Sequence, residues 1–338
     1  MADLSTDYMG LKLKNPVIVG ACGLTSDLNT MLKLEKAGAG AVVCKSLFEE
    51  QVQLAEMKFQ KALHKDDELH AEMVTIHPQL EYSGAAEHLY WVKKVKEALS
   101  IPVIASLNAV TQDVWIDYAG KLAETGVDGL ELNFYAAPGR EAVPPGDIEQ
   151  EQIALLKAIR KKVRLPLCVK LSPYYTNTYD FVKKLNAAGA DGFVLFNRLF
   201  QSDIDIDKEQ NIFPFTFSHK EDNRLSLRYA GLLASQIGGT ICCSTGITDR
   251  DDVVKMLLAG ADAVQIVSTL YRNGISYISS LLDGILEWME KKQYTTINDF
   301  RGKLSLEKIG KKDRWIYRRA QYVKILMQSG EELVNQIL

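Results

Sequence analysis

Short apolar runs recur along the chain, and four of them share one local pattern. Each run comes directly after a glycine that ends a stretch of mixed polar and apolar residues, in the pairs Ala37-Gly38, Thr125-Gly126, Ala188-Gly189 and Ala259-Gly260. Glycine just past a helix can adopt the left-handed backbone conformation that closes the last turn. Each repeat therefore predicts the end of a helix, a tight turn and a buried strand.

A second set of apolar runs lies between these repeats, at 16–20, 101–106, 165–171 and 239–244. The two sets together predict eight strands. The runs are continuous rather than alternating, as expected for parallel strands covered on both faces. Helices are predicted between most of them, at 112–124, 147–163, 178–187 and 249–258, several with acidic or hydroxyl residues that can cap their first turn.

Eight alternating strand and helix units over about 250 residues are typical of a closed (β/α)₈ TIM barrel of the α/β class. A doubly wound open sheet is the alternative, disfavoured by the strand count and by the absence of a G-x-G-x-x-G turn after the first strand. We predict a barrel over residues 1–292 and a C-terminal helical tail, 293–338, that packs on it. Two longer connections, 48–84 and 199–223, are expected to lie over the mouth of the barrel.

Composition narrows the class of protein. The 338 residues are 47% hydrophobic and 25% charged with a formal net charge of −3, which excludes a disordered chain and the basic surface of a nucleic-acid-binding protein. The five cysteines have the spacing of neither a disulfide framework nor an iron–sulfur cluster, and we expect no metal site. No signal peptide and no apolar run long enough to cross a membrane is evident, so we expect a cytoplasmic protein. The basic stretch 303–319 is interpreted as a solvated helix.

Polar residues gather just past the predicted strands, where barrels of this type place their functional groups. They include two lysines, Lys45 and Lys170, and two asparagines, Asn133 and Asn197. Buried charges and amides are costly without partners, so their convergence predicts a ligand. Cations beside paired amide donors and acceptors suit a flavin, whose reduced ring is anionic. Hydroxyls and backbone N–H groups after the last two strands, at 244–249 and 268–269, predict a phosphate site.

Several motifs in order resemble one known family, the soluble, class 1-like dihydroorotate dehydrogenases. The matching stretches are Asn15 to Gly23, Cys44-Lys45-Ser46, Glu131-Leu132-Asn133, Val169 to Tyr174, Asn197, Thr245-Gly246-Ile247, Gln265 to Leu270 and Tyr294 to Lys303. The resemblance implies FMN across the barrel mouth and oxidation of dihydroorotate to orotate in pyrimidine biosynthesis. It implies cofactor binding by Ala21, Gly23, Lys45, Ser46, Asn133, Lys170, Thr245, Gly246, Ser268 and Thr269, and substrate contacts from Lys45, Asn133 and Asn197.

The chain departs from the family pattern at the catalytic base. The family has a cysteine or serine in a segment similar to N-L-S-C-P-N, whereas either alignment here places Ala136 or Ala137 at that position. Tyr135 is the nearest replacement, since a phenol can relay a proton. The family's substrate loop has no clear counterpart between 72 and 84, where His77-Pro78 stands instead.

Three functions are therefore weighed: an FMN-dependent dihydroorotate dehydrogenase, a flavin oxidoreductase for a different planar substrate, and a non-catalytic flavin-binding paralogue. All predict a small-molecule ligand without nucleic acid or membrane. A homodimer is expected, and an electron-transfer partner subunit fits the resemblance. The electron acceptor, whether fumarate, a nicotinamide or a quinone, is left open by the sequence.

Overall fold

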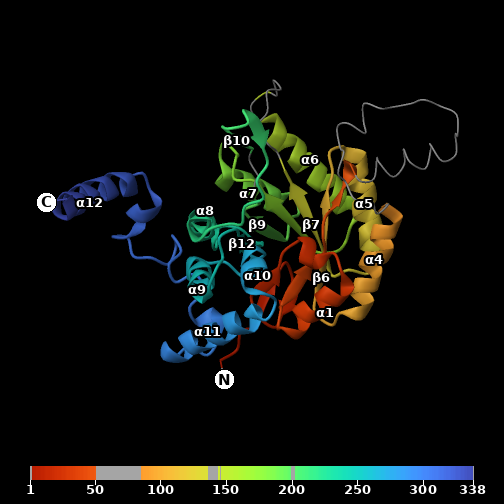
Figure 1. Cartoon of the computed structure of the whole chain (residues 1–338), viewed down its shortest axis with the longest axis horizontal. Coiled ribbons are helices and arrows are strands. Elements are labelled where there is room, and N and C mark those ends of the chain that lie inside the picture. Colours follow the sequence, from red (N-terminus) through yellow and green to blue (C-terminus); the bar gives the residue numbers. More distant parts are fainter. Residues whose placement is uncertain (1, 51–84, 136–143, 145, 199–201, 338) are drawn as a thin grey trace.

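Eight parallel strands close into a barrel in the computed structural model, which describes residues 2–50, 85–135, 144, 146–198 and 202–337 (Figure 1). The strands are β3 (Val17–Val19), β4 (Ala41–Val43), β6 (Val103–Asn108), β7 (Gly129–Phe134), β8 (Leu167–Leu171), β9 (Gly192–Leu195), β12 (Thr240–Ser244) and β13 (Ala263–Ile266). Each pairs with the next, and β13 pairs with β3. The predicted eight-stranded barrel is confirmed, and the open sheet is excluded by the β13–β3 and β4–β6 pairings.

Helices surround these strands in Figure 1, and the four predicted from the sequence agree with the structure to within one residue at each end. They begin where side chains satisfy free N–H groups: Asp27, Asn177 and Asp249 each accept a hydrogen bond from the backbone three residues on. The helices are α1 (Leu28–Lys36), α4 (Ala85–Ala98), α5 (Gln112–Glu124), α6 (Asp147–Lys162), α7 (Thr178–Ala187), α8 (Arg224–Leu233), α9 (Arg250–Ala259), α10 (Ser268–Asn273) and α11 (Tyr277–Lys291).

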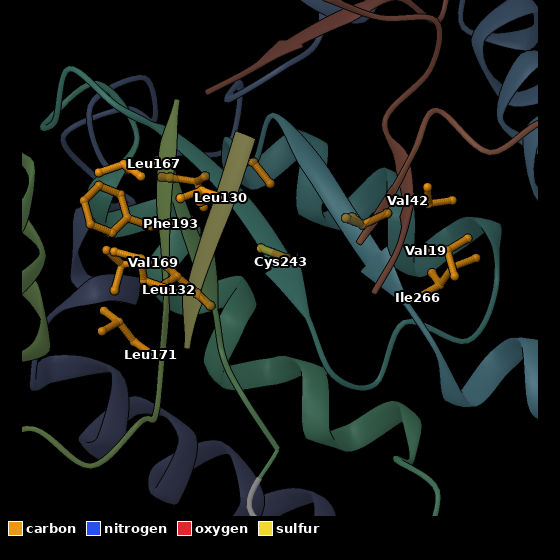
Figure 2. Packing of buried hydrophobic residues seen from close by; sticks show 14 of the residues in the cluster. Val19, Val42, Leu130, Leu132, Leu167, Val169, Leu171, Phe193, Cys243 and Ile266 are labelled. Atoms are coloured by element: carbon orange, nitrogen blue, oxygen red, sulfur yellow. The ribbon is translucent and has the colours of Figure 1, made fainter. Parts of the chain in front are cut away.

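The main core lies between the barrel and its helices, as Figure 2 shows for the outward-facing side chains of the strands. Leu130 and Leu132 of β7 pack there with Val169 of β8, and all three are fully buried. Successive strand residues point to opposite faces. Glu131 and Lys170, which lie between outward-facing residues, therefore point into the lumen of the barrel.

A hairpin that the sequence did not predict closes the bottom of the lumen. It consists of β1 (Thr6–Tyr8) and β2 (Leu11–Leu13), and Tyr8, Met9 and Leu13 pack against lumen residues of the barrel strands. A Cβ atom on Gly129, the first residue of β7, would lie 2.4 Å from the Met9 side chain. The glycine thus makes room for the hairpin that fills this end of the lumen.

That opposite end carries short added elements. β5 (Leu47–Phe48) pairs with the end of β6, and β10 (Asp203–Asp205) forms a hairpin with β11 (Gln210–Ile212), followed by the 3₁₀ helix η2 (Lys220–Asn223). A further 3₁₀ turn, η1 (Gly23–Thr25), follows β3.

The C-terminal segment begins by packing on the barrel. Ile297 in the turn η3 (Ile297–Asp299) and Phe300 are buried, and Leu306 N donates to the carbonyl of Gly231 in α8. After η4 (Arg314–Tyr317), helix α12 (Ala320–Ile337) extends away from the barrel in Figure 1. The division at residue 292 stays a prediction. In the described chain, none of the helices combines the length and apolar character that crossing a membrane requires.

Candidate active site

Two adjoining cavities open at the carboxyl ends of the barrel strands. The larger has a volume of about 890 Å³ and the smaller about 150 Å³. Ala21, Lys170, Asn197 and Arg198 line both, so the two form one continuous cleft. Its size is that of a site for a small molecule or cofactor.

The floor of the cleft is a buried polar cluster from three strands. Lys170 Nζ of β8 donates to Gln265 Oε1 of β13 at 3.2 Å and lies 3.7 Å from Glu131 Oε1 of β7. Gln265 Nε2 in turn donates to Glu131 Oε2 at 2.5 Å. Lys170 was predicted, but Glu131 and Gln265 were recognised only as parts of family motifs. The cluster places a cation, held by an acid and an amide, at the floor of the cleft.

Two asparagines form an amide pair on the wall of the larger cavity. Asn197 Nδ2 donates to Asn133 Oδ1 at 3.0 Å, and both residues line the cavity, as predicted. Tyr135 follows Asn133 by two residues, also lines the cavity and is 44% exposed. The arrangement offers paired donors and acceptors to a planar ligand, with a phenol beside them.

Other predicted residues take different positions around the rim. Ser46 lines the larger cavity, where its hydroxyl lies 2.7 Å from that of Ser106. Lys45 is exposed and is absent from the described lining of either cavity. Burial, and to a smaller extent the charge of Lys45, lowers the pKa of His88 to about 4.

Two further residues predicted to bind the cofactor do not line the described parts of either cavity. Gly23 packs against Tyr271, whose hydroxyl would lie 2.7 Å from a Cβ at position 23. The Thr269 hydroxyl is buried and donates to the carbonyl of Ile247 at 2.5 Å. Both residues shape the loops beside the cleft rather than its described surface.

The smaller cavity is built from the predicted phosphate-site residues Thr245, Gly246 and Ser268. Thr245 and Gly246 both have left-handed backbone conformations, with φ of 74° and 73°. A Cβ on Gly246 would lie 2.6 Å from backbone atoms of both His219 and Asn223. The turn is therefore packed tightly against η2, and its non-glycine left-handed residue is the kind of strain found at ligand sites.

The start of α9 is capped by the protein's own acids. Asp249 accepts from Asp252 N at 3.0 Å, and Asp252 accepts from both the N and Oγ1 of Thr248. An anion in the smaller cavity would therefore contact the turn at 245–247 and the Ser268 side of the cleft, instead of the start of α9.

Arg198 was not predicted from the sequence. It lines the two cavities and also a neighbouring hollow of about 490 Å³. Its Nη2 donates to Thr216 Oγ1 at 2.9 Å, and its Nη1 donates to the Thr216 carbonyl. Two bonds to one residue fix the plane of the guanidinium beside Asn197. Thr216 belongs to the connection 199–223, whose residues 215–218 line the smaller cavity.

The base position and the altered substrate loop lie outside the described residues; these are Ala136, Ala137, His77 and Pro78. Within the described residues, acids, histidines and cysteines form no group that could hold a metal ion.

Comparison with known proteins gives a consistent result. The family model described as Dihydroorotate dehydrogenase matches residues 3–289. A protein of Thermoplasma acidophilum named Dihydroorotate dehydrogenase B (NAD(+)), catalytic subunit, is 27% identical over 309 residues, which cover 89% of this chain and 99% of the relative. Proteins of the same name from Methanocaldococcus jannaschii and Pyrococcus abyssi are each 27% identical, over 304 and 306 residues. These alignments cover 86% and 88% of this chain, and 95% and 98% of those relatives.

Proposed function

Because the chain belongs to the dihydroorotate dehydrogenase family, we propose that it is an FMN-dependent oxidoreductase acting on a CH–CH bond of a planar, anionic substrate. The observation that supports this most is the cluster below the cleft, where Lys170 is held by Gln265 and Glu131. A buried cation at the floor of a cavity is suited to a ring that becomes anionic on reduction.

The residues of the cleft suit FMN in both shape and chemistry. Ala21, Ser46, Asn133 and Lys170 line the larger cavity and would contact the ring. Thr245, Gly246 and Ser268 line the smaller one, whose hydroxyls and glycine turn suit a phosphate. Lys45, Gly23 and Thr269 would act less directly, through the loops that they shape. Bound FMN would supply the two-electron acceptor of the reaction.

The substrate would lie beside the asparagine pair. The Asn133 and Asn197 amides can orient a ring that carries amide groups, and the Arg198 guanidinium can bind a carboxylate. Since Ala136 and Ala137 have no proton acceptor, Tyr135 Oη is proposed to relay the substrate's proton to solvent. Lys45 would add positive charge at the rim.

A second planar substrate remains a candidate beside dihydroorotate. The alanines at the base position are the reason to weigh a related cyclic amide, whereas Arg198 suits the carboxylate of either substrate. The relatives are named as catalytic subunits, which supports an electron-transfer partner for this chain as well. A homodimer and a cytoplasmic location complete the proposal.

Anaerobic mixing tests the proposed function. Protein loaded with FMN should lose the flavin's visible absorbance when dihydroorotate is added. Bleaching by another carboxylated cyclic amide, with none by dihydroorotate, would identify the second substrate class. A chain that takes up no FMN would refute the flavoenzyme proposal altogether.

A further inference from the structure

Glu131 is an unusual residue to find inside a barrel. It is 1% exposed, and its Oε1 has no hydrogen-bond donor in the described structure. Its other oxygen accepts from Gln265, and the nearest cation, Lys170, lies 3.7 Å away. Removing a carboxylate from water costs several kcal/mol, which an imperfect ion pair does not fully return. Stability alone therefore does not explain an acid here.

The surroundings of Glu131 make its charge effective. Below it lie Tyr8, Cys168 and Cys242, all fully buried. Burial, and to a smaller extent the charge of Glu131, raises the pKa of both Cys168 and Cys242 well above the usual value, so these thiols stay neutral. Above it lies the cavity that Lys170 lines. In this poorly solvated space the Glu131 carboxylate and the Lys170 ammonium act on the ligand together.

We propose that Glu131 is a positioning residue that, with Gln265, fixes the Lys170 ammonium below the ring and partly offsets its positive charge. The inference rests on the proposed binding of FMN. Positive charge stabilises the anionic reduced ring, and negative charge opposes it. Glu131 thus keeps the equilibrium between oxidised and reduced flavin closer to the oxidised form than Lys170 alone would.

The alternative is that Glu131 only fills space in the lumen. Glu131→Gln separates the two explanations, because it keeps the shape and an oxygen that can accept from Gln265 but removes the charge. Asp128→Asn is the matched control. Asp128 directly precedes β7 at the opposite end of the barrel, where it accepts from Val103 N and pairs with Lys96 at 2.7 Å.

The measurement is the reduction potential of bound FMN, obtained by equilibration with a reference dye. Glu131→Gln is expected to shift the equilibrium toward reduced flavin at least about tenfold, close to 30 mV for a two-electron couple. Asp128→Asn should stay within about threefold of the wild type. Glu131→Asp, which retains the charge, should restore most of the wild-type potential.

A second comparison does not depend on the single variant folding. The double variant Lys170→Met/Glu131→Gln removes both charges of the pair. It should favour reduced flavin at least about tenfold more than Lys170→Met does, which again corresponds to close to 30 mV. Equal potentials in that comparison, or an unchanged potential in a folded Glu131→Gln protein, would overturn the inference. Failure of the wild type to take up FMN would instead overturn the proposed function.

Discussion

Gly246→Ala tests whether the turn after β12 shapes the phosphate end of the cleft. The backbone of Gly246 has φ of +73°, and an added Cβ would lie 2.6 Å from both His219 O and Asn223 N. These are backbone atoms, so the methyl group cannot be accommodated by turning a side chain. Gly126→Ala is the matched control, because Gly126 has φ of +84° but nothing within 4 Å of its added Cβ.

The two variants separate backbone strain from steric contact. A left-handed alanine costs about 1–2 kcal/mol, and Gly126→Ala should lower the free energy of unfolding by that amount. Gly246→Ala should lower the free energy of unfolding by about 1–3 kcal/mol more than Gly126→Ala does. This is the usual cost of forcing extra atoms into a packed site. The displacement of η2 or of the turn should also weaken FMN binding at least about tenfold, equivalent to 1.4 kcal/mol.

Urea unfolding of the protein without FMN measures the first quantity, and quenching of FMN fluorescence on binding measures the second. Gly126→Ala should bind FMN as the wild type does. If the two variants have equal stability and equal FMN affinity, the turn at Gly246 is not a close-packed wall of the site.

Three further predictions follow from single side chains. His88→Phe should make urea unfolding less sensitive to acid. The pKa of His88 is about 4 in the folded protein and about 6.5 in the unfolded chain, so the unfolded chain binds a proton that the folded protein does not. The wild type should therefore lose up to about 3 kcal/mol of stability as the pH falls from 6.5 to 4. An equal loss in the variant would contradict this. Arg198→Met should raise the Kd for orotate roughly tenfold or more, with binding measured by the change in the flavin spectrum. Arg164→Met, far from the mouth of the barrel, should leave that Kd unchanged. Tyr135→Phe should slow flavin reduction by substrate roughly a hundredfold, and an unchanged rate would exclude a role for the phenol.

The fold could be predicted from the sequence because each strand is marked by a short pattern of neighbouring residues. Four strands were identified by a glycine that ends the preceding helix and four by apolar runs between these repeats, and barrel closure follows from their number. The hairpin around Met9 was missed because it is stabilised by packing into the lumen, including the space left at Gly129. That contact depends on the assembled barrel.

The site was predicted only where residues directly follow a strand or lie close to its end. This rule found Asn133, Lys170 and Asn197, which the structure brings to one cleft. It missed Glu131 because that residue lies within an apolar strand, although a charged residue alternating with Leu130 and Leu132 was a usable signal. Arg198 was missed for another reason, since its direction is set by a loop contact to Thr216.

The central claim is that one cleft at the barrel mouth binds both a flavin and an anionic planar substrate. A crystal structure of the protein with FMN and orotate tests it most directly. The account expects the flavin ring against Lys170 and Asn133, its phosphate at Gly246 and Ser268, and the orotate carboxylate at Arg198. Ligand density at any other place, or none in this cleft at saturating ligand, would contradict it.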